Sequence, residues 1–257
     1  MAELEALIFD VDGTLADTER DGHRVAFNLA FKEAGLDWEW SVELYGKLLA
    51  VTGGKERIRH YLANYNTAFQ GPAELDQFIA GLHAAKTEHY TRMLAEGMIP
   101  VRNGVKRLLQ EAREQGMRLA IATTTTPANV SALLQHSLDP HAESWFEVIA
   151  AGDIVPAKKP APDIYIWAMQ QMKLKPQVCM AFEDSHNGVQ SASRASIDTI
   201  LVTTNGYTVE DDFTGASLII DQLGEPDQPF QRLNGSVGDF SYTNIEMLRA
   251  LHGLGVK

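Results

Sequence analysis

The sequence predicts an α/β protein in which a parallel-sheet core carries an inserted helical cap. Three observations support this. From residue 97 onward, short apolar runs of strand type alternate with helical segments, as in a parallel sheet covered on both faces. The sequence pattern of residues 17–96 predicts helices only and contains no convincing strand. Several apolar runs end in polar clusters, and ligands bind at the carboxyl ends of strands in such sheets.

Composition and charge exclude several classes of function. The chain has 257 residues, of which 45% are hydrophobic, so it can form one large globular domain or two modest ones. Its net charge of -12 argues against general binding to nucleic acids and against binding to anionic membrane surfaces. The single cysteine, Cys179, excludes an intramolecular disulfide and lies in an apolar run, which is typical of a small core residue.

Location is predicted from the absence of targeting signals. No apolar stretch is long enough to span a bilayer, and Met1 leads into the first strand without a signal segment. We therefore expect no membrane partner and a cytoplasmic location, or an organelle stroma if a transit segment has been removed. The sequence leaves the oligomeric state open and favours a monomer.

Helix and strand patterns divide the chain into a core and a cap. We assign residues 1–16 and 97–257 to the core, with 224–257 as a C-terminal extension, and residues 17–96 to the cap. Helices are expected in the cap over 17–33, 41–49, 55–65 and 72–94. Core strands are expected over 7–9, 117–123, 146–150, 178–182, 199–203 and 218–220, and core helices over 103–115, 127–135, 163–172, 187–195 and 244–252. The segment 224–238 is expected to wander over the surface.

The first strand delivers two carboxylates to the ligand-binding edge of the predicted sheet. The apolar run Leu7-Ile8-Phe9 leads directly into Asp10-Val11-Asp12-Gly13-Thr14. Strand alternation points Asp10 and Asp12 the same way, although the turn can swing Asp12 outward. Two such close acids repel each other unless a cation or a shared proton holds them, which suggests a hard metal such as Mg2+. The competing interpretation is an Asp-Gly turn with a capping aspartate.

Two later strand ends carry groups that suit phosphate oxygens. One strand runs into four threonines, residues 123–126, whose hydroxyls and backbone amides suit an anion. A helix cap before Pro127 would account for one threonine but not for four. Lys159 is followed by Pro-Ala-Pro, which fixes the backbone and opens the next helix, while Lys158 reads as a solvated neighbour.

The strand over 178–182 ends in the adjacent acids Glu183 and Asp184. An isolated acid at this place would also suit a helix N-cap. Asn187, at the start of the next helix, is placed to steady these acids or Lys159.

These four strand ends resemble, in order, the four motifs of the haloacid dehalogenase superfamily of phosphotransferases, over residues 4–220. The resemblance implies a Rossmann-like core in which Asp10 attacks phosphorus to form an aspartyl-phosphate and Asp12 acts as general acid and base. It implies that Thr123 binds the transferring phosphoryl group and that Lys159 neutralises this group and the nucleophile. It further implies a Mg2+ site with the ligands Asp10, the backbone carbonyl of Asp12, Asp184, and Glu183 either directly or through water.

Selectivity is expected in the cap, which we predict to close over the site. The flexible pair Gly53-Gly54 precedes Lys55 and Arg57, two cationic side chains that suit binding of a second anionic group. A helix N-terminus with solvated basic residues explains this segment equally well. Lys86 is a weaker candidate that also fits a solvated helix face.

The cap's position resembles the β-phosphoglucomutase-like branch, and residues 17–24 with 52–57 resemble the CbbY type, phosphatases of sugar bisphosphates. This implies xylulose-1,5-bisphosphate, a Rubisco inhibitor, as substrate. The implied contacts are Glu19, Gly53, Gly54, Lys55, Arg57, Lys86, Thr123, Thr124, Thr125 and Lys159. The mutase branch usually has a histidine five residues after the acid matching Asp17; here that place is Gly22, and His23 follows. A sugar-phosphate mutase, a sugar-monophosphate phosphatase of broad specificity and a non-catalytic binding protein remain alternatives, although the intact acid and lysine set speaks against the last.

Overall fold

The computed structural model describes residues 3–51 and 53–255, so Met1, Ala2 and Thr52, which the sequence analysis used, lie outside the described residues. The chain separates into two compact units. Met1–Asp17 and Pro100–Lys257 form one, called here the α/β unit, and Thr18–Ile99 form the other, called the helical unit.

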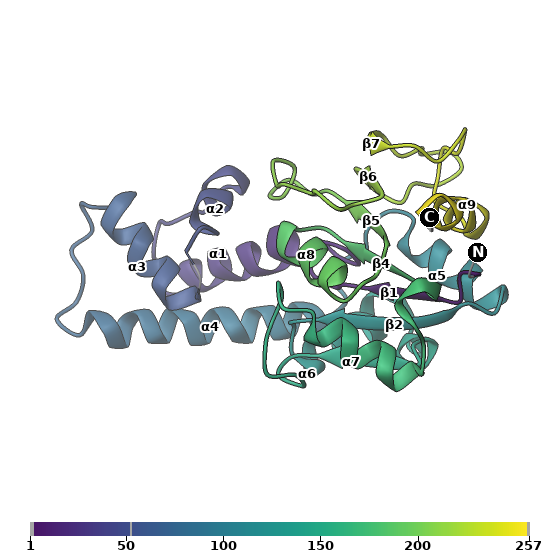
Figure 1. Cartoon of the computed structure of the whole chain (residues 1–257). Helices are drawn as coiled ribbons and strands as arrows, with labels where there is room; N and C mark the ends of the chain where they lie inside the picture. The colour runs from purple at the N-terminus through teal and green to yellow at the C-terminus, as the bar shows by residue number, and fades with distance from the viewer. Residues whose placement is uncertain (1–2, 52, 256–257) are drawn as a thin grey trace. The chain divides into compact units, whose positions relative to one another are not determined.

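The α/β unit is built on a seven-stranded sheet with the order β3-β2-β1-β4-β5-β6-β7 (Figure 1). Its strands are β1 (Ala6–Phe9), β2 (Arg118–Thr123), β3 (Val148–Ala151), β4 (Cys179–Glu183), β5 (Thr199–Thr203), β6 (Leu218–Ile220) and β7 (Arg232–Gly235). The strands β1 to β6 run parallel, and β7 pairs antiparallel with β6. The order reverses at β1, which is where open α/β sheets bind ligands.

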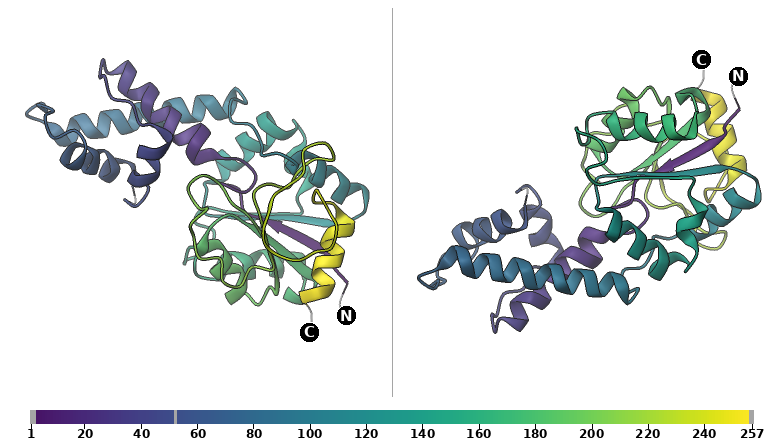
Figure 2. Two further views of the ribbon diagram at one scale, coloured as in Figure 1. Left: turned by 90° about the horizontal axis from the view of Figure 1, so that it is seen from above. Right: turned by 90° about the horizontal axis from the view of Figure 1, so that it is seen from below.

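Helices cover both faces of this sheet (Figure 2). The described helices of the α/β unit are α5 (Val105–Glu114), α6 (Pro127–Leu133), α7 (Asp163–Met172), α8 (His186–Arg194) and α9 (Ile245–Gly255). Apolar residues of α7 and α8 pack against one face, while α5 packs on β2, and α9 on α5 and β5, on the other. Because both faces are covered, every residue of β1 is buried, as the apolar run predicts.

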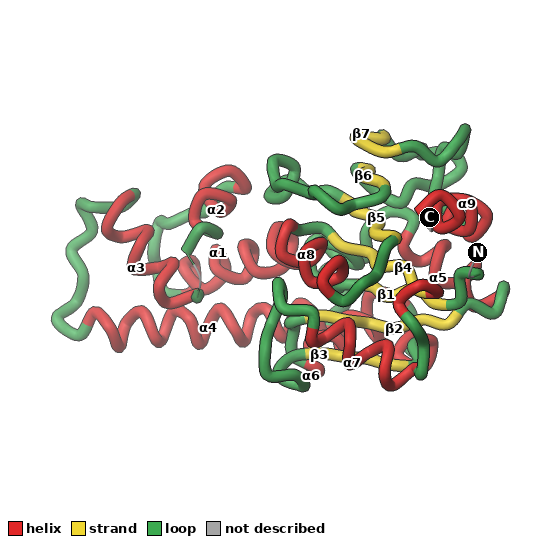
Figure 3. The backbone as a smooth tube through the Cα atoms, in the orientation of Figure 1, coloured by secondary structure: helices red, strands yellow, loops and turns green. Residues whose placement is uncertain are grey.

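The helical unit contains only helices and loops among its described residues (Figure 3). Its helices are α1 (Arg24–Glu33), α2 (Val42–Leu48), α3 (Gly54–Asn64) and α4 (Leu75–Ala95). The helices α1 and α4 pack along each other. An aromatic cluster fills the interior, formed by Phe27, Phe31, Trp38, Trp40, Tyr45 and Tyr61. None of the helices within residues 3–51 and 53–255 is long and apolar enough to cross a membrane.

Two departures from the predicted elements concern the residues before α1 and the segment 224–238. The helix expected from residue 17 begins with η1 (Thr18–His23), a π-helical turn, before α1 starts at Arg24. A π-helix closes i to i+5 hydrogen bonds, so this turn holds more residues than an α-turn. The segment 224–238, expected to wander over the surface, is mostly exposed but includes the strand β7. All four residues of β7 are exposed, so its backbone pairs with β6 without any burial pattern that the sequence would display.

Candidate active site

The central strand places Asp10 at the carboxyl edge of the sheet. Phe9, the last residue of β1, pairs with Ile121 of β2 and with Phe182 of β4, so Asp10 emerges between two strands. The backbone N–H of Asp10 donates to the carbonyl oxygen of Phe182 at 3.0 Å. Only 7% of Asp10 is exposed, which leaves its carboxylate in a pocket with little bulk water around it.

A buried ammonium joins two of the predicted site residues. Lys159 Nζ donates to Oδ1 of Asp10 and to Oε1 of Glu183, both at 2.6 Å. Burial by itself lowers the pKa of Lys159, but the two carboxylates outweigh it and hold that pKa above its ordinary value. The lysine therefore stays charged throughout the neutral range. Lys158, by contrast, pairs with Asp153 at the surface, in line with its interpretation as a solvated neighbour.

Glu183 is fixed by two donors on one oxygen. The hydroxyl of Tyr165 donates to Oε1 of Glu183 at 2.5 Å, beside the contact with Lys159. The other oxygen, Oε2, is buried and has no hydrogen-bond partner. Burial raises the pKa of Glu183 against the opposing effect of Lys159. Burial, together with Asp10 and Glu183, also raises the pKa of Asp184 well above its ordinary value.

The acids fit a hard divalent cation. Oxygens of Asp10, Glu183 and Asp184 all lie within 4.8 Å of one another, and all three residues are buried. One ammonium faces three buried carboxyl groups, so Lys159 alone cannot balance their charge when all three are ionised. The unpartnered Oε2 of Glu183 and the raised pKa of Asp184 both indicate negative charge that the chain itself leaves uncompensated. Carboxylate oxygens are what Mg2+ prefers, so the donor set suits this ion.

A pocket of about 260 Å³ opens beside these groups. It is lined by Asp10, Asp12, Thr124, Lys159, Asp184, Ser185 and Asn187. The predicted threonine loop forms part of its wall. Thr125 donates its hydroxyl to Oδ2 of Asp12, and Oγ1 of the fully buried Thr123 accepts from the N–H of Thr125 at 3.3 Å. Residues of all four predicted motifs therefore line one pocket of the α/β unit, although Lys159 lies eight residues after the end of β3 and not at a strand end.

Three residues near the pocket were missed by the sequence analysis. Tyr165 supports Glu183, Ser185 caps α8 by accepting from the N–H of Gly188 at 3.3 Å, and Asn205 donates to Asp184. Ser185 was detectable as an N-cap residue directly before a helix. Asn205 lies two residues after the end of β5, so a search for polar residues just after each strand would have found it.

In the helical unit, two of the predicted residues, Glu19 and Arg57, contact the hydroxyl of Tyr45. Tyr45 donates its hydroxyl to Oε2 of Glu19 at 2.6 Å and accepts from Nη1 of Arg57 at 2.8 Å. Arg57 also donates to the backbone carbonyls of Leu48 and Val51. Lys55 is exposed, and Gly53 has a φ of 95° at the start of α3. These hydrogen bonds hold the guanidinium of Arg57 in place, so Arg57 is not the solvated basic residue of the competing interpretation. Lys55 is exposed and does fit that interpretation.

Lys86 is buried, so the competing interpretation of a solvated helix face does not hold for it. Its Nζ lies 2.7 Å from Nδ1 of His23 and sits over the rings of Phe27 and Tyr90 at 5.2 and 5.0 Å. Burial lowers the pKa of Lys86 to about 8. Burial and the nearby Lys86 lower the pKa of His23 well below its ordinary value, so the neutral ring accepts from the ammonium.

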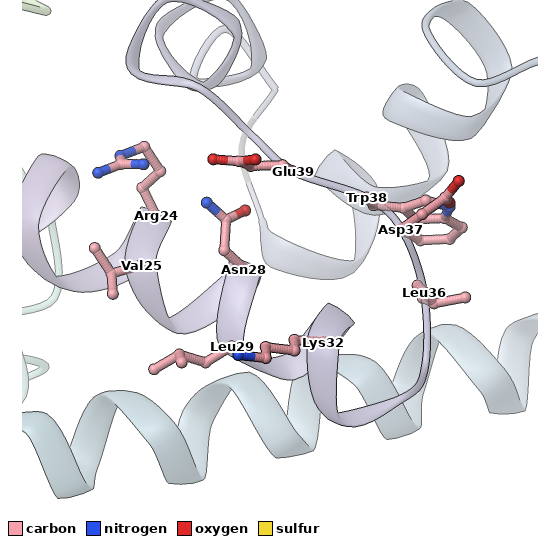
Figure 4. A pocket seen from close by; sticks show the side chains of 9 residues that line it. All are labelled: Arg24, Val25, Asn28, Leu29, Lys32, Leu36, Asp37, Trp38 and Glu39. Carbon is pink, nitrogen blue, oxygen red and sulfur yellow. The ribbon is translucent and has the colours of Figure 1, made fainter.

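A second pocket, of about 400 Å³, lies on the helical unit (Figure 4). Its lining residues are Arg24, Val25, Asn28, Leu29, Lys32, Leu36, Asp37, Trp38 and Glu39. Arg24 and Asn28 both donate to the carbonyl oxygen of Trp40, and Asn28 accepts from its N–H at 2.8 Å. These hydrogen bonds attach the chain after α1 to that helix.

Comparison with known proteins defines the class of this enzyme. The model of the haloacid dehalogenase-like hydrolase family matches residues 4–196. The chain therefore belongs to this family and is a phosphatase, which confirms the family prediction.

Within the family, the chain is similar to the CbbY proteins. It is 50% identical to Protein CbbY of Rhodobacter capsulatus over 86% of this chain and 94% of the relative. The plasmid-encoded CbbY protein of Cupriavidus necator is 44% identical over 97% of both chains. A mutant CbbY from Rhodobacter sphaeroides, solved in complex with xylulose-1,5-bisphosphate, matches with a TM-score of 0.68 and 44% identity over 85% of this chain and 94% of that one.

Proposed function

We propose that the chain is a Mg2+-dependent phosphatase that hydrolyses xylulose-1,5-bisphosphate through an aspartyl-phosphate on Asp10. The observation that carries this proposal is the buried contact of 2.6 Å between Lys159 Nζ and Asp10 Oδ1, beside three clustered carboxylates. The similar protein from Rhodobacter sphaeroides, solved in complex with this bisphosphate, supports the choice of substrate.

The first step transfers the phosphoryl group to the enzyme. The Asp10 carboxylate attacks phosphorus, and a new P–O bond forms as the bond to the sugar oxygen breaks. Asp12 gives its proton to the departing sugar oxygen, so the sugar leaves as an alcohol. The hydroxyl of Thr125, which donates to Oδ2 of Asp12, holds this carboxyl at the pocket.

The second step restores the free enzyme. Asp12, now ionised, takes a proton from a water molecule whose oxygen attacks phosphorus. The bond between phosphorus and Asp10 breaks, and inorganic phosphate leaves with Asp10 again a carboxylate. Asp12 thus serves as the acid in the first step and as the base in the second. The first step leaves it ionised, as the second requires, and the second step protonates it again.

Catalysis in this chemistry comes mainly from stabilising charge on the phosphoryl oxygens. Lys159 supplies a fixed positive charge, and Thr123 and the amides of the threonine loop supply hydrogen-bond donors. Mg2+ would supply further positive charge. Its proposed ligands are Asp10, the backbone carbonyl of Asp12, Asp184 and Glu183.

A bisphosphate carries a second phosphate and a sugar backbone, and we assign these to the helical unit. Arg57 offers a guanidinium that Tyr45 and two backbone carbonyls already hold in place. Lys55, on the same helix, adds an exposed ammonium beside Gly53 and Gly54. Glu19 is proposed to accept hydrogen bonds from sugar hydroxyls, and Lys86 to contribute positive charge.

The test is a panel of sugar monophosphates and bisphosphates, incubated with the full chain in Mg2+ and in EDTA. We expect phosphate release that needs Mg2+ and is fastest with xylulose-1,5-bisphosphate. An isomerised sugar phosphate with little free phosphate would establish the mutase alternative. Equal rates across monophosphates would establish a phosphatase of broad specificity, and no turnover of any member would contradict the proposal.

A further inference from the structure

The loop after β5 reaches the acid cluster through a single amide. Asn205 follows Thr203 and Thr204, and its Nδ2 donates to Oδ2 of Asp184 at 2.8 Å. The register of β4 and β5 explains this approach, because Glu183 pairs with Val202 and the two strands therefore end side by side. Asp184 is buried, so this bond acts in a setting where water competes little.

The orientation of the Asn205 amide is determined by its own loop. Its Oδ1 accepts from the backbone N–H of Tyr207 at 2.9 Å, so the NH2 end has to face Asp184. The backbone carbonyl of Asn205 also accepts from the N–H groups of Thr208 and Val209. The amide is thus held at both ends and presents a donor in one direction.

The turn after β1 leaves room for this pair. Gly13 has a φ of 78°, a conformation that glycine adopts readily and other residues rarely do. A Cβ at this position would clash with the carboxylate of Asp184 and would lie 2.8 Å from Nδ2 of Asn205. Both the backbone conformation and the packing therefore require glycine here.

Arg102 ties the two loops together. Its guanidinium donates to the carbonyl of Gly13, to the carbonyls of Thr203 and Thr204, and to the hydroxyl of Thr203. The same side chain reaches the carbonyl of Asp221 at 2.8 Å. The loop that carries Asn205 is consequently fixed to the loop that contains Asp12 and Gly13.

We infer that Asn205 is a positioning residue for Asp184, which sets the rotation of this carboxylate and thereby the affinity of the acid cluster for Mg2+. The inference rests on the proposed Mg2+ dependence. Groups that orient metal ligands commonly change metal affinity by about 10- to 100-fold when they are removed. Because the amide engages Oδ2, its loss would let the carboxylate turn among several orientations in the absence of the ion.

The test measures Mg2+ binding without turnover. Mg2+ is titrated calorimetrically into the full chain, its Asn205→Ala variant and an Asn103→Ala control. Asn103 is a matched control because its Nδ2 also donates to a side-chain oxygen, that of Gln222, at 2.9 Å, and neither residue belongs to the cluster of Asp10, Glu183 and Asp184. We expect about 10-fold weaker binding for Asn205→Ala and unchanged binding for Asn103→Ala. Asn205→Leu, similar in shape, replaces the alanine variant if that variant fails to fold.

A second measurement separates positioning from general damage. The Mg2+ concentration that gives half-maximal phosphate release should rise by the same factor in Asn205→Ala, while kcat at saturating Mg2+ approaches the wild-type value. Wild-type Mg2+ affinity in a folded Asn205 variant would overturn the inference and leave the proposed function standing. No Mg2+ binding by the wild-type chain would overturn the proposed metal dependence, and the inference with it.

Discussion

Lys159 Nζ lies 2.6 Å from Oδ1 of Asp10, although 149 positions separate the two residues in the chain. The same ammonium contacts Oε1 of Glu183 at 2.6 Å, so one cation is shared by two buried carboxylates. Removing any one of the three residues therefore leaves a charge imbalance in a place that water reaches poorly. The first two predictions follow from this contact.

Asp10→Asn should abolish turnover while the protein still folds. The amide keeps the size of the side chain but cannot attack phosphorus, so we expect a loss of about 10⁴-fold or more in kcat. Phosphate release measures this, and circular dichroism checks the fold. Asp153→Asn, which alters an exposed acid of the same unit, serves as control and should keep full activity. Full activity of Asp10→Asn would contradict the assigned nucleophile.

Lys159→Ala should destabilise the protein as well as inactivate it. It leaves the carboxylates of Asp10 and Glu183 buried without their cation, and breaking a buried pair in this way costs about 3–5 kcal/mol. Lys158→Ala breaks only an exposed pair and should cost no more than about 1 kcal/mol. Urea unfolding of both variants measures the difference, and equal losses would refute this account of Lys159.

Gly188→Ala tests how tightly α8 packs against Glu183. A Cβ at Gly188 would clash with Oε2 of Glu183, so the carboxylate or the helix must move. We expect a loss of about 1–3 kcal/mol in stability and reduced activity. Gly253→Ala is the matched control, since a Cβ there meets no atom within 4 Å and the change should stabilise α9 by about 0.5–1 kcal/mol. Similar behaviour of both variants would count against the proposed crowding.

Lys86 should give stability a specific pH dependence. Its folded pKa is about 8, below the value of 10.5 in an unfolded chain, so between these pH values the unfolded state binds the additional proton. The free energy of unfolding of the wild type should therefore rise with pH across this window, relative to Lys86→Met, by at most about 3 kcal/mol. His23, whose pKa is lowered well below 6.5, titrates outside this window. Denaturation from pH 7 to 10.5 measures the difference, and parallel curves would contradict it.

The α/β unit was largely predictable because apolar runs and helix-capping residues are visible in short stretches of sequence. The parallel arrangement of the strands then brings their polar ends together at one edge of the sheet. Helix α7 and strand β5 have the bounds that the sequence predicts. Polar residues at the ends of β1, β2 and β4 meet because parallel neighbours end at one edge of the sheet. The position of Lys159 follows from none of these strands, and the resemblance to a family motif supplied it.

Other features were missed for identifiable reasons. Lys86 has the helical spacing of the buried residues of α4, which include Ile79, Leu82, Tyr90 and Met93. This spacing predicts a position on the inner face of the helix, whereas the charge of the side chain favours exposure to solvent. Burial of such a lysine depends on partners such as His23, which lies 63 positions away. Strand β7 could not be predicted from hydrophobic periodicity, because its side chains are exposed and it joins the sheet through backbone pairing with β6.

The π-helical turn η1 determines where His23, the residue directly before α1, lies in the folded chain. Counted from Asp17, the place where the mutase branch has its histidine holds Gly22. In the folded chain, however, the π-helical turn brings the next residue, His23, onto the ring of Tyr90, with ring centroids 3.9 Å apart. Such a turn absorbs one inserted residue without changing the phase of the helix that follows. Counting positions from Asp17 as if along a regular α-helix would therefore misplace the side chain that this chain stacks on Tyr90.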